Sequence, residues 1–169
     1  MDFNKKRKAT LIISIFIQIS LGVMYAWSVF QTPIVNTFGW TTAQVSIAFT
    51  ICSAVGILSP FGGKLLEYLK AKRIILIGGL LYGGGLILTG FTSSPSHLYI
   101  SFGILTGLGL TLVYPLVTSH LVKMFPEKRG LVSGLMVASY GSGAVIIAPV
   151  GASLTASYGV LTSFKILGA

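Results

Sequence analysis

The chain has 169 residues, of which 53% are hydrophobic and only 9% are charged, and its 12 Lys and Arg against 3 Asp and Glu give a net charge of +9. A soluble domain carries about 25% charged residues, so this composition excludes a soluble nucleic-acid-binding protein and, by its apolar fraction, a disordered chain. The single cysteine, Cys52, excludes a disulfide framework and a cysteine-rich zinc site, which leaves an integral membrane protein with basic loops.

The membrane-spanning helices are predicted from three stretches without any charged residue, at 9–63, 74–122 and 130–164. A transmembrane helix needs about 20 apolar residues, so each of the first two stretches holds a pair of spans, and the third holds one span and the start of another. Turn-forming residues predict loops at 31–41, 92–97 and 152–159. The sequence thus predicts an all-α membrane protein of one domain, with five complete transmembrane helices and the start of a sixth. Their expected ranges are 9–30, 42–61, 74–91, 98–122, 130–154 and 158–169.

The basic residues predict how these helices are oriented. Of the 12 Lys and Arg, all but Lys165 lie in the segments 5–8, 64–73 and 123–129. These segments fall on the same side of the predicted spans, and the positive-inside rule places that side, with the N-terminus, in the cytoplasm. The first apolar stretch is too long for a signal peptide and lacks a clean cleavage site, so an uncleaved span in the plasma (inner) membrane is expected.

Glycines spaced four residues apart predict close packing of these helices. In lipid, helices associate through small residues that let their backbones approach, because burying apolar surface against a neighbour brings little gain. The pairs are Gly79 with Gly83, Gly103 with Gly107, and Gly130 with Gly134.

Groups for catalysis or metal binding are sparse. His97 and His120 have neither a carboxylate nor a cysteine nearby in the sequence. A metal site or a nucleophile–base pair needs more partners than these. We therefore expect neither an enzyme nor a bound cofactor.

Tyrosines near the middle of the predicted spans are candidates for a transport site. Tyr114 and Tyr140 each lie about ten residues from a basic segment, which at 1.5 Å per residue places both about 15 Å deep. Tyr25 lies further out, about 24 Å from the start of its span at the same rise. Such tyrosines either bind a substrate through their hydroxyls or simply pack between helices, and the pattern leaves both open. Gln18 and Gln44 are likewise either site groups or interhelical hydrogen-bonding residues.

Three stretches of the chain carry a family resemblance. They are GVMYAWSVF at 22–30, the run at 107–144 that joins two glycine-rich helices through a tyrosine and the loop FPEKRG, and GGKLLEYLKAKR at 62–73. On these motifs the chain resembles the major facilitator superfamily and, more narrowly, its oxalate/formate antiporter family of carboxylate transporters. The resemblance implies an incomplete N-terminal six-helix bundle of that fold, with Tyr25, Tyr114 and Tyr140 lining the central cavity.

The third stretch resembles a degenerate form of the superfamily's loop motif G-x-L-x-D-R-x-G-R. Gly63 matches the motif, Glu67 stands where the family usually has Asp, and Tyr68 departs from its Arg. The resemblance implies a conformational loop that includes Gly63, Glu67 and Arg73. The alternative is an ordinary loop in which Glu67 pairs locally with a basic neighbour, which contributes little when exposed.

The resemblance also bears on length and function. Transporters of this superfamily have twelve helices in two halves, and the second half of the oxalate/formate family holds the cationic residues that meet the substrate. We therefore expect an N-terminal fragment of a secondary-active transporter of small carboxylates (oxalate/formate or lactate/pyruvate-like), inactive without its C-terminal half. Lys165 could meet an anion, although snorkelling at a helix end is the simpler explanation. The alternative function is a non-transporting helical membrane protein that acts as an assembly partner.

Overall fold

The computed structural model describes residues 3–60 and 70–169, and every regular element within them is helical, as the sequence predicts. The first span consists of α1 (Phe3–Leu21), the 3₁₀ turn η1 (Gly22–Ala26) and α2 (Trp27–Phe38). The chain then returns along α2 through α3 (Thr42–Val55) and the short 3₁₀ turn η2 (Gly56–Leu58).

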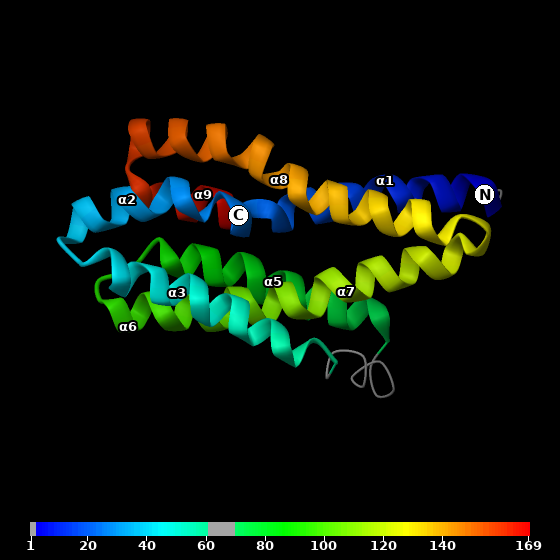
Figure 1. The fold of residues 1–169 in the computed structure, drawn as a ribbon, viewed down its shortest axis with the longest axis horizontal. Coiled ribbons are helices and arrows are strands. Elements are labelled where there is room, and N and C mark those ends of the chain that lie inside the picture. The colour runs from blue at the N-terminus through cyan, green and yellow to red at the C-terminus, as the bar shows by residue number, and fades with distance from the viewer. Residues whose placement is uncertain (1–2, 61–69) are drawn as a thin grey trace.

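The remaining helices complete a bundle whose elements run along its long axis (Figure 1). They are α5 (Ala71–Thr89), α6 (Pro95–Leu98), the π-helical segment η3 (Tyr99–Thr106), α7 (Gly107–Met124), η4 (Pro126–Lys128), α8 (Arg129–Tyr158) and α9 (Val160–Gly168).

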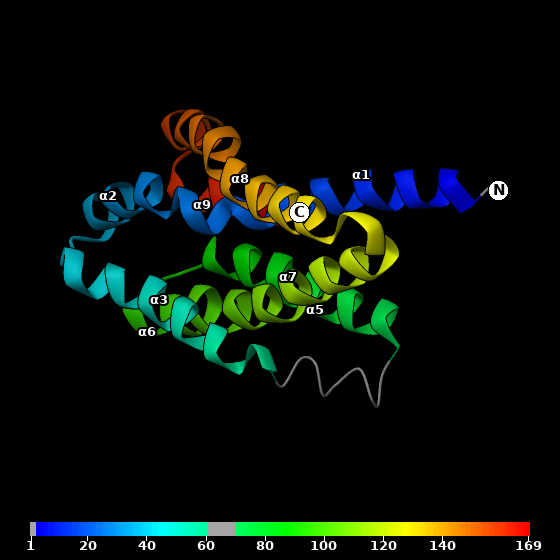
Figure 2. The same ribbon diagram turned by 45° about the vertical axis from the view of Figure 1, so that its right-hand side comes forward.

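Two layers are visible in both views (Figures 1 and 2). One layer contains α1, α2, α8 and α9, and the other contains α3, α5, α6 and α7. The layers are joined by α5, which packs along α7 in its own layer and along α9 in the other. We call the end of the bundle with the α2–α3 turn the turn end, and the opposite end, which holds the N-terminus and the η4 segment, the basic end.

Four helical segments are long and apolar enough to cross a membrane. They are Lys5–Phe38, Ala71–Thr89, Pro95–Met124 and Pro126–Tyr158, and a shorter apolar helix covers Thr42–Leu58. The predicted second span, 42–61, extends beyond the described residues. The count of five complete spans and the start of a sixth therefore stays a prediction.

The loop predicted at 31–41 is wrong for most of its length. The helix continues to Phe38, with Pro33 inside it, and Gly39 ends it in a left-handed conformation at φ 67°. Thr41 then caps α3. Polar residues in this stretch resemble a loop in sequence, but a helix accommodates them when side-chain hydroxyls bond to backbone carbonyls one turn earlier. The first span is therefore longer than the predicted range 9–30.

The turn predicted at 152–159 is also shorter in the structure. The helix α8 runs to Tyr158, and the chain turns at Gly159, whose φ is 80°. The hydroxyl of Ser163 donates to the carbonyl of Gly159 over 2.9 Å, and the hydroxyl of Thr155 donates to Ser163 over 3.2 Å. These bonds pair the polar groups at the helix break. A longer polar loop is therefore not required for the turn.

A buried aromatic cluster fixes α2 in the bundle. The Trp27 ring lies 4.1 Å from that of Phe102, centroid to centroid, and the Phe30 ring lies 4.8 Å from that of Phe164. All four side chains are buried. Since Trp27 follows η1 directly, this cluster also fixes the position of the C-terminal end of η1.

The glycine pairs differ in their surroundings. A Cβ atom on Gly103 would lie 2.9 Å from Ile51, and one on Gly107 would lie 3.1 Å from the backbone of Cys52, so α3 packs closely against this pair. By contrast, no described atom lies within 4 Å of a Cβ atom on Gly130 or Gly134. The expectation of close packing is confirmed for the pair at 103 and 107 and is wrong for the pair at 130 and 134. Another close backbone crossing involves two other glycines, described below.

Candidate functional site

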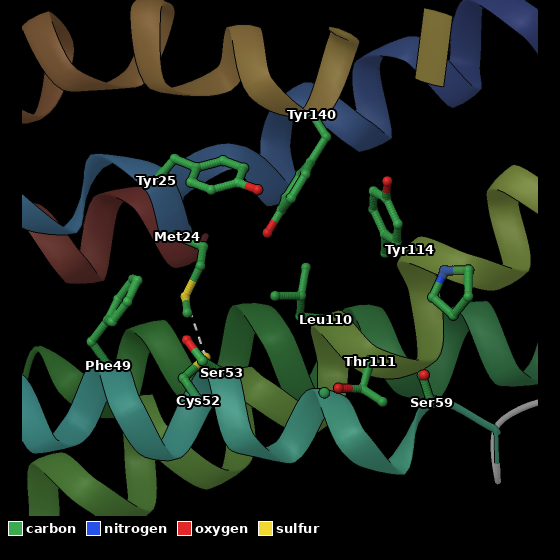
Figure 3. A pocket seen from close by; sticks show the side chains of 12 residues that line it. Met24, Tyr25, Phe49, Cys52, Ser53, Ser59, Leu110, Thr111, Tyr114 and Tyr140 are labelled. Atoms are coloured by element: carbon green, nitrogen blue, oxygen red, sulfur yellow. Dashed lines mark hydrogen bonds between the residues drawn. The ribbon is translucent and has the colours of Figure 1, made fainter. Parts of the chain in front are cut away.

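Three tyrosines from three elements meet inside the bundle. Tyr25 lies on η1, Tyr114 on α7 and Tyr140 on α8, and their side chains converge (Figure 3). The ring of Tyr140 lies 4.7 Å from that of Tyr25 and 4.8 Å from that of Tyr114, centroid to centroid. The tilt between the rings is 54° and 55°, which is typical of favourable aromatic contacts. The structure thus brings together the three tyrosines singled out from the sequence.

The position of Tyr25 depends on a close crossing of the first span with α8. A Cβ atom on Gly22 would lie only 2.5 Å from the Cα atom of Gly143, so the two backbones touch at glycine. Tyr25 and Tyr140 both lie three residues from this crossing. The sequence predicts that Tyr25 and Tyr140 lie at different depths in the membrane. The crossing nevertheless brings their rings into contact.

We call the space next to these rings the tyrosine cavity. It has a volume of about 380 Å³ and lies between η1, α3, α7 and α8. Its apolar wall includes Met24, Phe49 and Leu110, and hydroxyl groups of Ser53 and Thr111 add polar atoms (Figure 3). A mixed lining of aromatic rings with a few hydrogen-bonding groups is typical of small-molecule sites.

The single cysteine of the chain also lines the tyrosine cavity. The Cys52 side chain is buried, and its sulfur lies 3.4 Å from the sulfur of Met24. Cys52 therefore offers a native chemical probe of this space.

None of the described residues that line the tyrosine cavity is charged. Lys165 lies elsewhere, with its ammonium group 3.8 Å from the centroid of the Phe91 ring, beyond the end of α5. The cavity can therefore offer hydrogen bonds and an apolar wall, whereas the described residues supply it with no counter-ion for an anion.

Two buried polar side chains form hydrogen bonds next to the tyrosines. The hydroxyl of Tyr82 on α5 donates to the carbonyl of Leu21, 2.9 Å away, at the start of η1. The amide of Gln18 donates to the hydroxyl of Thr118 over 2.9 Å, next to Tyr114. Gln18 is thus an interhelical hydrogen-bonding residue. Gln44 takes neither of the two roles considered for it, because it caps α3 together with Thr41.

Most of the predicted conformational loop lies outside the described residues. Gly63 and Glu67 lie outside the described residues, and Arg73 is an exposed residue in the first turn of α5. Its role therefore stays a prediction.

An ion pair at the basic end is not predicted by the sequence. The guanidinium of Arg7 pairs with the carboxylate of Glu127 and also lies over the Phe125 ring, 4.2 Å from its centroid. A hydrogen bond from its own backbone amide, and then the bond from Arg7, hold the pKa of the exposed Glu127 carboxyl below its usual value. These residues are far apart in sequence, and no local pattern signals their contact.

Comparison with known proteins bears on the identity of the chain. It is 34% identical over 169 residues to the uncharacterized MFS-type transporter YhjX of Escherichia coli, covering 99% of this chain. It is 30% identical over 148 residues to the oxalate:formate antiporter of Oxalobacter formigenes, covering 87% of this chain. It is 33% identical over 142 residues to human monocarboxylate transporter 12, covering 83% of this chain.

The matches cover most of this chain but a minority of each relative. The chain spans 42%, 35% and 28% of the length of these three proteins, in the same order. The sequence profile of the Major Facilitator Superfamily matches residues 11–169, which is nearly the whole chain. It is therefore an integral membrane protein that belongs to the Major Facilitator Superfamily.

Proposed function

We propose that the chain forms one wall of the substrate site in a secondary-active transporter of small carboxylates, such as oxalate and formate or lactate and pyruvate. The observation that carries this proposal is the convergence of Tyr25, Tyr114 and Tyr140 on one cavity. The names of the relatives support it, because they include an oxalate:formate antiporter and a monocarboxylate transporter.

The tyrosines suit a carboxylate for a physical reason. A phenolic hydroxyl donates a hydrogen bond to a carboxylate oxygen, and such charge-assisted bonds are stronger than neutral ones. The rings and Met24 supply an apolar surface for the carbon skeleton. The tyrosine cavity therefore offers both kinds of contact that a small organic acid needs.

The charge of the substrate needs a partner that the described residues around the cavity do not supply. An anion in a dry cavity without a compensating charge is costly, and no charged group lines the described part of the cavity. We propose that a further segment, corresponding to the part of the relatives that this chain does not cover, supplies a cationic group opposite the tyrosines. Rocking of the two parts would then expose the site to each side of the membrane in turn.

The proposed orientation follows from the basic residues. Among the described residues, Lys and Arg gather at the basic end in the segments 5–8, 70–73 and 123–129. The positive-inside rule then places the basic end in the cytoplasm and the turn end outside the plasma membrane.

The test is uptake of labelled oxalate, formate and lactate by proteoliposomes that contain the product of the complete gene. Saturable uptake of at least one of them is expected. Tyr114→Phe and Tyr140→Phe should each raise the KM by about tenfold, because a hydrogen bond to a charged group is lost.

The matched control is Tyr158→Phe, since Tyr158 is an exposed tyrosine at the end of α8 that does not line the cavity. It should leave uptake unchanged. Absence of carboxylate uptake, or equal KM values in all three variants, would contradict the proposed function. Saturable uptake by residues 1–169 alone would contradict the need for a further segment.

A further inference from the structure

A second cavity lies between α2 and α3, closer to the turn end than the tyrosine cavity. We call it the turn-side cavity, and its volume is about 280 Å³. Its polar lining consists of Ser28 and Gln31 from α2, and Ser46 and Thr50 from α3. Four hydrogen-bonding side chains thus face one space within a bundle that is otherwise strongly apolar.

The hydroxyls alone would not indicate a site. Ser46 donates to the carbonyl of Thr42 over 2.8 Å, and Thr50 donates to the carbonyl of Ser46 over 3.2 Å. Such bonds to the preceding turn let a hydroxyl sit in a membrane helix with no further partner.

Gln31 needs more than these bonds provide. Its amide donates to the hydroxyl of Ser46 over 2.7 Å, which is the one hydrogen bond of this side chain among the described residues. The second N–H and the carbonyl oxygen of an amide also need partners. Gln31 is only half-buried, so these two groups are free to bind water or a polar ligand in the turn-side cavity.

The two cavities share two residues. Tyr25 and Phe49 line both of them, and both lie at one end of the tyrosine cavity in Figure 3. We call this pair the aromatic divider. On α3, Thr50 lines the turn-side cavity and Ser53 lines the tyrosine cavity, less than one helical turn apart. Hydroxyls therefore line α3 on both sides of the divider.

We propose that the turn-side cavity is a transient binding site for the small carboxylate on its way between the turn end and the tyrosine cavity, and that the aromatic divider controls passage between the two. In a wet cavity the anion keeps part of its hydration shell, so hydrogen bonds from Gln31 and the hydroxyls suffice and no cation is required. This inference rests on the proposed function for its substrate, whereas its geometry rests on the two cavities alone.

Cysteine accessibility tests whether the turn-side cavity is wet. In the product of the complete gene, Cys52→Ser removes the native thiol, and Ser28→Cys or Thr50→Cys then places one thiol in the cavity. A charged, membrane-impermeant methanethiosulfonate is applied from the turn end. The matched control is Ile47→Cys, because Ile47 lies on α3 next to Ser46, is 43% exposed and lines neither cavity.

The two cavity thiols should react about a hundredfold faster than the control, because the charged reagent is excluded from lipid. Millimolar oxalate, formate or lactate should slow their labelling. Equal rates at positions 28, 47 and 50 would overturn the proposal of a wet cavity. Fast labelling without protection by any of these acids would overturn the binding site.

The divider is tested with native Cys52, which lies on its far side in the tyrosine cavity. Phe49→Ala should speed labelling of Cys52 from the turn end by about tenfold, while Ile47→Ala, two residues away on the same helix, should not. An unchanged rate in Phe49→Ala would overturn the role of the divider. These labelling rates in the absence of substrate do not depend on which substrate is carried, so they stand even if the carboxylate proposal fails.

Discussion

The hydroxyl of Tyr82 donates a hydrogen bond to the carbonyl oxygen of Leu21, 2.9 Å away, where the first span changes from α-helix to 3₁₀ turn. A second, longer contact of 3.3 Å reaches the carbonyl of Ser20. A change of helix type leaves backbone carbonyls without their usual partners, and in lipid these need a replacement. Tyr82 supplies one, and it thereby stabilises the turn from which Tyr25 reaches its cavity.

Removal of this hydroxyl should destabilise the bundle. We expect Tyr82→Phe to lower the free energy of unfolding by about 1 kcal/mol, because a buried carbonyl loses its partner. Unfolding by a denaturing detergent, followed by circular dichroism, measures the change. Tyr158→Phe is the control, since Tyr158 is exposed. Equal stability of the two variants would show that water replaces the hydroxyl without cost.

The glycine crossing beside Tyr25 should tolerate no side chain. A Cβ atom on Gly143 would lie 2.5 Å from Gly22 at the start of η1, so Gly143→Ala must separate the first span from α8. We expect a loss of about 1–3 kcal/mol, as is typical of overpacking. Gly141→Ala is a strong control, because no described atom lies within 4 Å of the added Cβ atom two residues away. A similar effect of both changes on thermal stability in detergent would contradict the crossing.

The sequence was informative about where the helices lie and less informative about where they end. Long apolar runs predict spans because the bilayer sets a minimum length. At the end of α2, however, the hydroxyl of Thr37 donates to the carbonyl of Pro33 over 2.7 Å, so a stretch that resembles a loop stays helical. The η1 break was not predicted, and Tyr82, which hydrogen-bonds to the carbonyl of Leu21 at this break, is distant in sequence.

For the candidate site, too, the sequence predicts some features and not others. The tyrosines were predicted from depth and from a family resemblance, and their rings meet in the structure. Their supports are contacts between distant helices, such as Gly22 with Gly143. Single-sequence patterns report on neighbours along one helix, whereas these contacts depend on how two helices cross. The packing around a predicted site was therefore the part that required the structure.

Lys165 should act on stability rather than on transport. Its ammonium group lies over the Phe91 ring, and such cation–π contacts contribute about 0.5–1 kcal/mol at exposed sites. We expect Lys165→Met, which keeps an apolar stem, to lower thermal stability slightly and to leave the KM for carboxylate unchanged in the uptake assay. Phe91→Leu should have the same small effect on stability. A large increase in KM with Lys165→Met would show that this lysine meets the substrate.

The ion pair between Arg7 and Glu127 should make stability depend on pH in the acidic range. The folded structure lowers the pKa of Glu127, so its carboxylate stabilises the bundle above the unfolded value of about 4.3. This contribution is lost as the pH falls through the lower folded pKa.

The comparison is the melting temperature of the native chain and of Glu127→Gln as a function of pH. The two should differ by a constant amount at neutral pH and converge as the solution becomes more acidic than about pH 4. Arg7→Gln should weaken this dependence without abolishing it, because the backbone amide of Glu127, the larger cause of the lowered pKa, remains. A difference between native and Glu127→Gln that persists unchanged at low pH would mean that Glu127 acts through packing rather than through its charge.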